Sequence, residues 1–467
     1  MVVSASSTAA PAGLHSARGC HQSSDLNHAK QNARVAALRK AFKRVFNDEA
    51  DFVVRAPGRV NIIGEHIDYC GYGVFPMAVE QDILVAAKKT TSNTIELRNV
   101  EVRYPKYSCP LSAISINSSS PQWFDYFLCG VKAIQERFSG TSLPGMHLLV
   151  EGCIPPAAGM SSSSALVCSA ALAAMNAIGE DLPRDELASL CAKCERYVGV
   201  QGGGMDQAIC LLAEEGAAKL IQFEPALTAQ TVQLPPAAVF VVANSCVEIN
   251  KGNTSYYNTR VVECRLAAQL ILEKNGKEWR KPVRLSHVQK CLKLSLEKAA
   301  ELVKSTLHAH PYSLAELCEV FGMSTEEFVS WALSEKTKNI TSFDLHNRAL
   351  HVFQEARRVY QFKAACETGD INRMGELMMQ SHASCRDLYE CSHPLVDQLV
   401  ELCCQNGALG SRLTGAGWGG CSVTLTVASK VSSIVAALEK GFYGPRGLTT
   451  AGNVFVSTPA DRGRIFA

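Results

Sequence analysis

Four consecutive serines, Ser161–Ser164, follow the small residues of Gly152–Gly159 and lead directly into an apolar helical pattern. Small residues let the backbone close around a ligand, and the first turn of a helix presents unpaired N–H groups to an anion. A serine-rich N-cap explains part of this pattern, but one cap needs only one hydroxyl. The run therefore favours a phosphate-binding loop at the start of a helix.

This phosphate-binding loop is not a P-loop, because it contains no lysine and the sequence has no G-x-x-x-x-G-K-[ST]. Backbone N–H groups, hydroxyls and a divalent cation must then balance the charge of a bound triphosphate. Mg²⁺ usually takes few protein ligands and keeps phosphate oxygens and waters. Ser163 and a nearby carboxylate could supply the protein ligands.

A single carboxylate, Asp206, follows the three glycines Gly202–Gly204. A glycine loop can approach a ligand closely, although an aspartate in such a loop can also be a simple turn former. The segment Arg55–Tyr69 interleaves Arg, Asn, Glu, His and Asp with apolar residues, and buried charges need partners or a ligand. His66 alone would be structural, but clustered with Glu65 and Asp68 it suits recognition of a polyol.

Near the C-terminal end, Gly415–Gly420 matches G-x-G-x-x-G. A strand-like segment follows these glycines, whereas a dinucleotide fingerprint needs a strand before them and a helix after them. A protein kinase is disfavoured because there is no H-R-D catalytic loop and no D-F-G. Taken alone, the glycines indicate a tight turn entering a hairpin.

The order of the strands and helices that must position these residues predicts an α+β protein of two domains. We expect a flexible tail over 1–30, an N-terminal domain over 31–245 that binds sugar and phosphate, and a C-terminal domain over 246–467 with a helical insertion at about 275–340. A helix should begin near Asn32. The expected strands are Phe52–Arg55, Ile83–Ala87, Thr94–Leu97, Met146–Val150 and Ala238–Asn244, with a final β pair of Ser422–Val427 and Asn453–Ser457. The expected helices include Ser163–Ile178, Pro183–Val198, Leu345–Thr368 and Leu395–Cys404.

Composition places the 467-residue chain among globular proteins, with 47% hydrophobic and 19% charged residues. The net charge of +2 suggests neither a nucleic acid nor an anionic membrane as partner. The most apolar stretch, Ala165–Ile178, is too short to span a bilayer. The 19 cysteines are scattered, which indicates a reducing compartment, and we expect the cytoplasm. A faint likeness of the tail to an organellar transit peptide is the alternative.

In this order the motifs resemble the GHMP superfamily of small-molecule kinases, which contains galactokinase, homoserine kinase, mevalonate kinase and phosphomevalonate kinase. Gly58–Tyr69 resembles the galactokinase signature, and the serine loop and Leu413–Cys421 resemble the other two superfamily motifs. The resemblance covers about 52–460. It implies a two-domain fold with the active site in the cleft between the domains. Three segments, Tyr69–Asp82, Ala243–Glu248 and Ser384–Cys391, resemble the N-acetylgalactosamine kinase branch.

The resemblance implies ATP-dependent phosphorylation of the anomeric C1 hydroxyl of N-acetylgalactosamine, and of galactose less well, to the α-1-phosphate and ADP. Galactokinase proper is the alternative, and the two differ in whether the pocket accommodates an acetamido group at C2. A catalytically silent sensor of sugar and ATP is an alternative of another class, against which the intact Arg59, Asp206 and serine loop argue. We expect a monomer with the sugar and ATP as its small-molecule partners.

The resemblance also assigns roles to individual residues. Asp206 matches the catalytic aspartate and Arg59 the arginine beside it. The sugar would be bound by Arg59, Glu65, His66, Asp68, Gly203, Asp206 and Tyr257; the nucleotide by Gly159, Ser161, Ser162, Ser163, Asn244 and Ser245, with Trp123 at the adenine; and Mg²⁺ by Ser163 and Glu195. Two positions depart from the family pattern: Met160 stands where leucine is usual, and Ser164 where many relatives have alanine.

Overall fold

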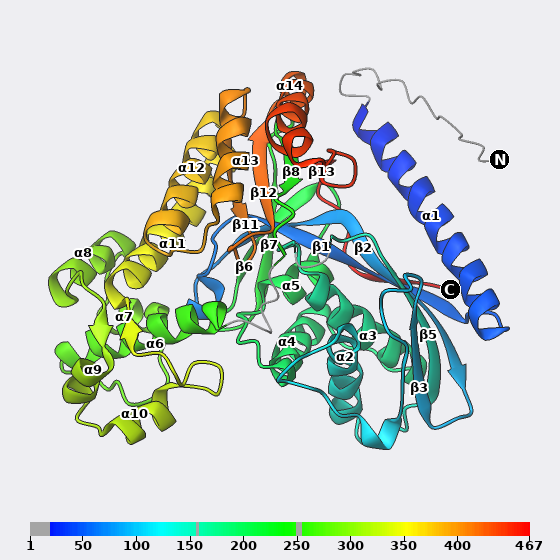
Figure 1. Ribbon diagram of the computed structural model, residues 1–467, viewed down its shortest axis with the longest axis horizontal. Coiled ribbons are helices and arrows are strands. Elements are labelled where there is room, and N and C mark those ends of the chain that lie inside the picture. Colours follow the sequence, from blue (N-terminus) through cyan, green and yellow to red (C-terminus); the bar gives the residue numbers. More distant parts are fainter. Residues whose placement is uncertain (1–18, 156–157, 249–254) are drawn as a thin grey trace.

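Two β-sheets, each covered by helices, form the framework of the protein in a computed structural model that describes residues 19–155, 158–248 and 255–467 (Figure 1). The larger sheet of the described residues has six strands in the order β14-β1-β2-β5-β3-β4. Its strands are β1 (Phe52–Ile63), β2 (Phe75–Thr90), β3 (Thr94–Asn99), β4 (Tyr107–Pro110), β5 (Gly145–Gly152) and β14 (Arg464–Phe466).

Both faces of this sheet are buried, and successive residues of a strand pack on opposite faces. Val53, Leu84 and Leu149 pack with helix α1 (Gly19–Phe46), whereas their neighbours belong to the main core with α2 (Trp123–Arg137) and α3 (Ser162–Ile178). The sheet is therefore a rigid layer against which α3 is fixed, and the serine run forms the first turn of that helix.

Helix α1 begins at Gly19, earlier than the start expected near Asn32, so residues 19–30 of the expected tail are helical. Residues 1–18 lie outside the described residues. Its apolar residues Leu38 and Phe42 are buried against the sheet. Arg34 adds ion pairs to Asp82 at 2.6 Å and to Glu151 at 3.0 Å, which anchor the helix.

The second sheet has the order β11-β12-β8-β13, from β8 (Val239–Asn244), β11 (Gly410–Thr414), β12 (Cys421–Thr426) and β13 (Val454–Ser457). The last two expected strands form, but they do not pair with each other, because β8 lies between them. Strand β8 thus belongs to the second sheet, although it lies before the boundary expected near 245. The chain then returns to the first sheet through β14. Local sequence patterns cannot reveal such long-range pairings.

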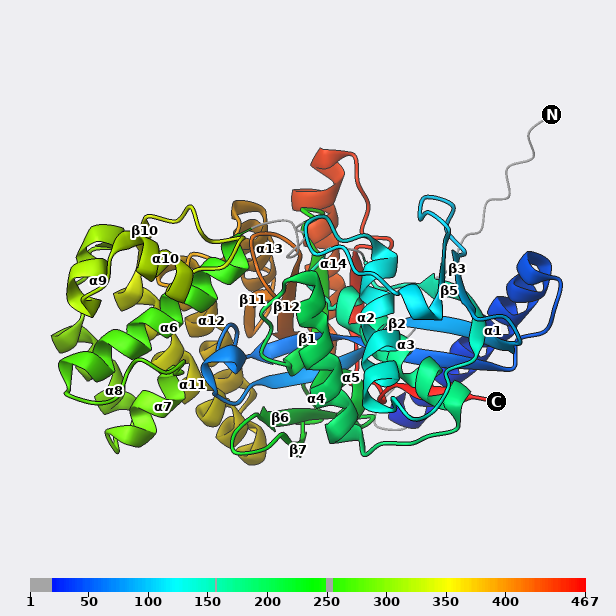
Figure 2. The same ribbon diagram turned by 90° about the horizontal axis from the view of Figure 1, so that it is seen from below.

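Helices account for most of the chain between Tyr256 and Gln405. The long helix α11 (Leu345–Thr368) has the predicted bounds, and α13 (Pro394–Gln405) lies within a residue of its prediction at each end. The segment 275–340 contains α7 (Leu285–Cys291), α8 (Leu296–Thr306), α9 (Leu314–Phe321) and α10 (Thr325–Ala332). Figure 2 shows these helices with α6 (Tyr256–Lys274) at the end of the molecule opposite α1. Helix α12 (Ile371–Asp387) also belongs to this part, and α14 (Val431–Leu438) follows strand β12.

None of the helices that the structure describes combines the length and the apolar composition that a bilayer crossing requires. The described cysteines are free thiols. Among them, Cys191 and Cys194 are buried in helix α4 (Arg184–Cys194), so this C-x-x-C contributes to packing.

Candidate active site

The serine run forms the first turn of α3, but its first member does not act as a simple cap. Ser161 is the N-cap residue with a left-handed φ of 61°, and its side chain makes no capping hydrogen bond. Its buried hydroxyl has no hydrogen-bond partner among the described residues. A buried polar atom without a partner is costly, so this hydroxyl is placed for a ligand and not for the helix.

A groove of about 870 Å³ opens in front of this helix end. It contains all but one of the positions expected to hold the nucleotide, namely Trp123, Gly159, Ser161, Ser162, Ser163 and Asn244. No lysine of the described residues lines it; its basic residue is Arg103, which pairs with Glu101 at 2.6 Å, and its other acidic residues are Glu195 and Glu248. With this arginine already paired, N–H groups, hydroxyls and a cation would balance the charge of an anionic nucleotide at the serine loop, as the sequence predicts.

Ser245 is the exception, because it does not line the groove. It is buried; its N–H donates to the Gly420 carbonyl at 2.8 Å and its hydroxyl accepts from the Val247 N–H at 3.3 Å. The prediction that Ser245 binds nucleotide is therefore not supported: the side chain faces inward and holds the loop after β8 to the glycine-rich hairpin.

Trp123 lies at the start of α2 on the opposite side of the groove. Its indole N–H donates to the Pro105 carbonyl at 3.0 Å, and its ring lies 6.1 Å from that of Tyr104. Both aromatic residues line the groove. This wall could stack on a nucleobase, in line with the predicted adenine contact.

Arg59 and Asp206 form an ion pair beside the groove, to which Arg59 is connected through Gly159. Arg59 comes from β1 and is 1% exposed; its Nε–H donates to Asp206 Oδ1 at 2.7 Å. Another guanidinium N–H of Arg59 donates to the Gly159 carbonyl. Asp206 lies in the first turn of α5 (Met205–Leu212), directly after the glycines. One arginine thus connects the candidate catalytic carboxylate to the candidate phosphate-binding loop.

A second cavity, here called the sugar cavity, lies on the other side of this ion pair. It is lined by all the residues expected to bind sugar: Arg59, Glu65, His66, Asp68, Gly203, Asp206 and Tyr257. Glu195 and Ala416 line both this cavity and the groove. The two spaces therefore meet beside Asp206, which is the geometry that transfer of a group from one ligand to another requires.

Glu65 and His66 line the sugar cavity, yet protein groups already engage their polar atoms. Glu65 Oε1 accepts from the Gly415 N–H at 2.8 Å and lies 3.4 Å from Arg412 Nη1. Burial raises the pKa of Glu65, against the lowering effect of Arg412 and Arg59. The His66 Nε2–H donates to the Ala416 carbonyl at 2.9 Å, so in a neutral ring Nδ1 accepts from the Tyr69 hydroxyl at 2.8 Å. Both side chains tie the sugar-cavity wall to the glycine-rich hairpin.

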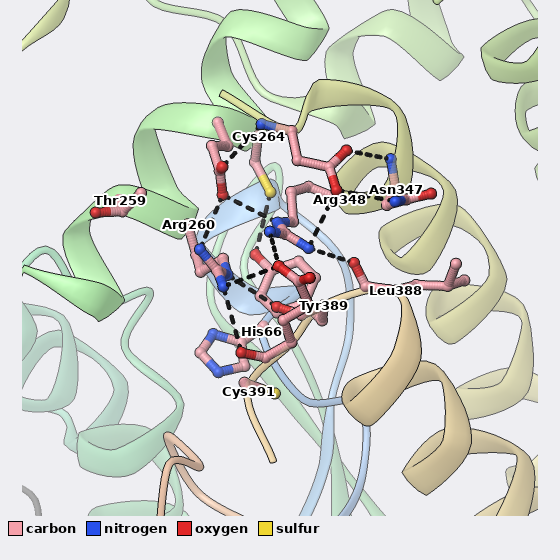
Figure 3. Close-up of polar contacts among 12 residues, drawn as sticks. His66, Thr259, Arg260, Cys264, Asn347, Arg348, Leu388, Tyr389 and Cys391 are labelled. Carbon is pink, nitrogen blue, oxygen red and sulfur yellow. Dashed lines mark hydrogen bonds and ion pairs between the residues drawn. The ribbon is translucent and has the colours of Figure 1, made fainter. Parts of the chain in front are cut away.

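A network of helix residues supports His66 from behind (Figure 3). The ring of Tyr389 lies 4.8 Å from that of His66, and its hydroxyl is 2.6 Å from that of Tyr69. Arg260 Nε–H donates to the Tyr389 carbonyl at 2.8 Å, and Arg348 Nε–H donates to Glu263 at 3.0 Å. Helices α6 and α11 and the segment that follows α12 therefore fix the orientation of the cavity wall.

Gly203 and Tyr257 complete the sugar cavity. A Cβ atom at Gly203 would overlap the Asp68 carboxyl carbon and the Tyr69 nitrogen, so this close approach requires glycine. Burial, together with the nearby carboxylates of Asp68 and Asp206, raises the pKa of Tyr257 well above its ordinary value. Its phenol thus stays protonated and can donate a hydrogen bond into the cavity.

Comparison with known proteins identifies the family. A galactokinase galactose-binding signature matches residues 40–89, and the N-terminal and C-terminal domains of GHMP kinases match 125–214 and 362–444. A galactokinase from Dictyostelium discoideum is 40% identical over 89% of each chain. The chain belongs to the galactokinase family. A galactokinase from Saccharomyces cerevisiae is 34% identical over 88% of this chain and 89% of its own.

Solved structures agree with this family. The crystal structure of Lactococcus lactis galactokinase complexed with galactose is 25% identical, has a TM-score of 0.73, and matches 92% of this chain and 99% of its own. The mevalonate kinase of Methanococcus jannaschii, at 17% identity and a TM-score of 0.52 over 88% of this chain and 98% of its own, shares the fold. The predicted α+β GHMP kinase fold is confirmed.

The third motif of the galactokinase family fits both interpretations of its glycines. Gly415–Gly420 is the turn of the β11–β12 hairpin, whose last paired residues are Thr414 and Cys421. A Cβ atom at Gly415 would overlap the backbone of Gly159. The hairpin turn thus packs directly against the phosphate-binding loop, of which Pro156 and Ala157 lie outside the described residues.

Glu195 and Ser163 fit the magnesium ligands predicted for them. Glu195 is 7% exposed, and its Oε2 accepts from the Ser164 hydroxyl at 2.8 Å and from the Gln207 amide. The departure at Ser164 thus provides a partner for this carboxylate. Ser163 is half-buried and lines the groove beside it. A carboxylate and a hydroxyl are oxygen donors of the kind that Mg²⁺ prefers.

Several site residues escaped the sequence analysis. Arg412 is fully buried in β11, pairs with Glu65, and donates to the Asn61 carbonyl at 3.0 Å. Glu355 of α11 accepts from the Gly64 N–H at 2.8 Å. The available signal for Arg412 was its position three residues before the glycine motif Gly415–Gly420. For Glu355 there was none, because its partner lies 291 residues away in sequence.

Proposed function

We propose that the protein is a galactokinase that transfers the γ-phosphoryl group of MgATP to the C1 hydroxyl of galactose, giving α-galactose 1-phosphate and ADP. The observation that carries the proposal is the Arg59–Asp206 pair, which lines the sugar cavity and contacts Gly159 of the groove through Arg59. Galactokinases at 40% and 34% identity support galactose as acceptor.

Asp206 would orient the C1 hydroxyl and accept its proton. Arg59, at 2.7 Å, favours the ionised carboxylate and balances charge that develops on the transferred group. Phosphoryl transfer has a loose transition state in most analyses, so alignment of the acceptor with the γ-phosphorus contributes at least as much as proton removal. The contact of Arg59 with Gly159 would hold the sugar and the nucleotide in a fixed position relative to each other.

Ser163 and Glu195 would hold Mg²⁺, which would neutralise part of the charge of the triphosphate. The groove has no lysine among the described residues, and its Arg103 already pairs with Glu101, so the cation would act with N–H groups and hydroxyls to balance the triphosphate. Ser161 would donate its hydroxyl to a phosphate oxygen. Trp123 would stack on the adenine.

The acceptor first expected from the sequence, N-acetylgalactosamine, is the second candidate. Its support is the resemblance of Tyr69–Asp82, Ala243–Glu248 and Ser384–Cys391 to the N-acetylgalactosamine kinase branch, whereas the galactokinase relatives favour galactose. The free thiols of the described cysteines support a reducing compartment such as the cytoplasm. A monomeric state stays a prediction.

The test is the release of ADP by the purified protein with MgATP and each of galactose, N-acetylgalactosamine and glucose. We expect kcat/KM for galactose to exceed that for glucose at least about a hundredfold, because a site built to hydrogen-bond a hydroxyl rejects the wrong epimer strongly. A higher kcat/KM for N-acetylgalactosamine than for galactose would assign the second candidate. No turnover with either galacto-configured sugar would contradict the proposal.

A further inference from the structure

A third cavity, which we call the insertion cavity, lies behind the loop Val200–Gly203 and has a volume of about 1460 Å³. Its walls come from this loop, from α6, from the segment Glu278–Lys290 and from Ser334–Lys336. Neither Arg59 nor Asp206 lines it. It therefore lies between the body of the N-terminal domain and the helical insertion, beside the site of the proposed reaction.

Positive charge dominates the insertion cavity. Its basic lining residues are Arg196, Arg265, Lys281, Arg284, Lys290 and Lys336, and its acidic ones are Glu224, Glu278 and Glu335. Among the described residues this is an excess of three positive charges (6 − 3) in one cavity of a chain whose net charge is only +2. Such a concentration of one sign attracts anions.

The acidic residues do not neutralise this excess. Glu224 pairs with both Arg284, at 3.0 Å, and Lys290, at 2.7 Å. Glu335 is bonded to Lys338, which does not line the cavity. Glu224 is thus shared by two cations of the cavity, and Glu335 is paired with a cation outside the cavity.

Arg265 shows the imbalance most clearly. It projects from α6, and its guanidinium donates to the Ala332 carbonyl, but no carboxylate of the described residues pairs with it. Burial lowers the pKa of Arg265. A partly desolvated guanidinium without a counter-charge is unfavourable unless an anionic ligand supplies one.

The rest of the lining is apolar in part, through Val261, Pro282, Val283 and Leu285. The volume far exceeds that of an inorganic phosphate. We propose that the insertion cavity binds a phosphorylated metabolite of nucleotide size, of the nucleoside diphosphate sugar class, with its phosphates toward Arg265 and Lys281 and its apolar part against Pro282 and Val283.

A ligand in the insertion cavity would affect the proposed reaction through the loop that lines both this cavity and the sugar cavity. Val200, Gly202 and Gly203 line both the insertion cavity and the sugar cavity, and Gly203 packs directly on Asp68. A ligand that orders this loop changes the affinity for the acceptor sugar, and the sugar changes the affinity for the ligand by the same factor. This coupling rests on the proposed function, whereas the binding itself does not.

The experiment is titration calorimetry of the full chain with uridine diphosphate glucose, in the presence of Mg²⁺, ADP and galactose at saturating concentrations. The probe carries neither adenine nor a galacto-configured sugar, and ADP and galactose would fill the active site. We expect saturable binding that weakens with added salt. The double variant Arg265→Gln/Lys281→Gln should weaken binding at least about tenfold, because two charge-assisted contacts are lost.

The matched control is Lys304→Gln on α8, an exposed cation of the same insertion that does not line the cavity, which should bind the probe as the wild type does. Because Arg265 is partly buried, Arg196→Gln/Lys281→Gln, at two exposed positions, gives an independent test. Absence of saturable binding, unchanged binding in both double variants, or displacement of ADP by the probe would overturn the proposal. Equal affinity for inorganic pyrophosphate would overturn the assigned ligand size. Binding without any change in galactose affinity would refute the coupling alone.

Discussion

The sugar cavity and the nucleotide groove differ in how far the protein satisfies its own polar groups. In the sugar cavity, Glu65 is bonded to Gly415 and Arg412, and His66 to Tyr69 and Ala416. In the groove, the buried hydroxyl of Ser161 has no partner among the described residues. The proposed acceptor end is therefore preorganised by side-chain networks, whereas the proposed donor end leaves a polar group for a ligand to engage.

The largest effect is expected where the two ends meet. Asp206→Ala should lower kcat by roughly 10²–10⁴-fold, through loss of proton transfer and of acceptor positioning. Steady-state release of ADP measures this. Asp206→Asn is the matched variant: it keeps the shape but cannot accept the proton, so comparison of the two separates positioning from base catalysis. Turnover near that of the wild type in Asp206→Ala would remove this residue from the mechanism.

A second change tests the cation at the donor end. Glu195→Gln should raise the Mg²⁺ concentration needed for half-maximal activity by about tenfold, since a ligand charge is lost at a groove without lysine among the described residues. Initial rates over a Mg²⁺ series at fixed ATP measure it. Glu180→Gln, at an exposed position, is the control. An unchanged Mg²⁺ requirement would show that Glu195 is only a packing partner of Ser164.

A smaller effect is expected from the hydroxyl of Ser161. Ser161→Ala should raise KM for ATP by roughly three- to tenfold, about the net value of one typical hydrogen bond, and leave KM for galactose unchanged. Because Ser161 has a φ of 61°, alanine also adds backbone strain that Ser161→Gly avoids. Equal effects of both changes on KM for ATP are expected. If only Ser161→Ala raised KM for ATP, the effect would come from backbone strain and not from the lost hydroxyl.

The preorganisation of the acceptor end should be measurable as a dependence of folding stability on acid pH, and not as an effect on catalysis. His351 is buried behind Glu65, whose carbonyl accepts from its Nε2–H at 3.1 Å, and burial lowers the pKa of His351 to about 4. The folded state therefore disfavours protonation of His351. The contribution of this residue to the free energy of unfolding is complete above pH 6.5 and is lost as the pH drops from 6.5 toward 4.

Urea unfolding at pH 7.5 and pH 5 measures this contribution. His351→Gln should reduce the loss of unfolding free energy over that interval by about 2 kcal/mol relative to the wild type, because the titrating group is removed. His310→Gln, at an exposed position, should leave the loss unchanged. An identical pH dependence in His351→Gln and the wild type would contradict a buried neutral imidazole.

Short-range patterns predicted much of the fold. Helix α11 repeats its apolar residues at helical spacing and ends at Gly369, so its bounds could be read from the sequence. Strand β1 was predicted only as far as Arg55, although it extends to Ile63. Its second half carries Arg59 and Asn61 and is buried on both faces, and charged residues there conceal the strand pattern. The position of β8 between β12 and β13 depends on partners far away in the chain.

Motif positions predicted which residues gather at the site, but not which way each side chain faces. Ser161 and Ser245 were assigned to the nucleotide on equal terms, yet one lines the groove and the other is turned inward against Val247. Likewise, the position of His66 in the motif does not reveal that Tyr69 and Ala416 engage its ring nitrogens. These differences arise from tertiary hydrogen bonds, which a linear pattern does not contain.

The most direct test of the account is a crystal structure of the protein with galactose and a non-hydrolysable MgATP analogue. The account predicts the galactose C1 oxygen within about 3 Å of the Asp206 carboxylate, with the terminal phosphorus on the far side of that oxygen at about 3–3.5 Å. The triphosphate should lie along Gly159–Ser163. A triphosphate bound away from the first turn of α3, or a different sugar hydroxyl facing Asp206, would contradict it.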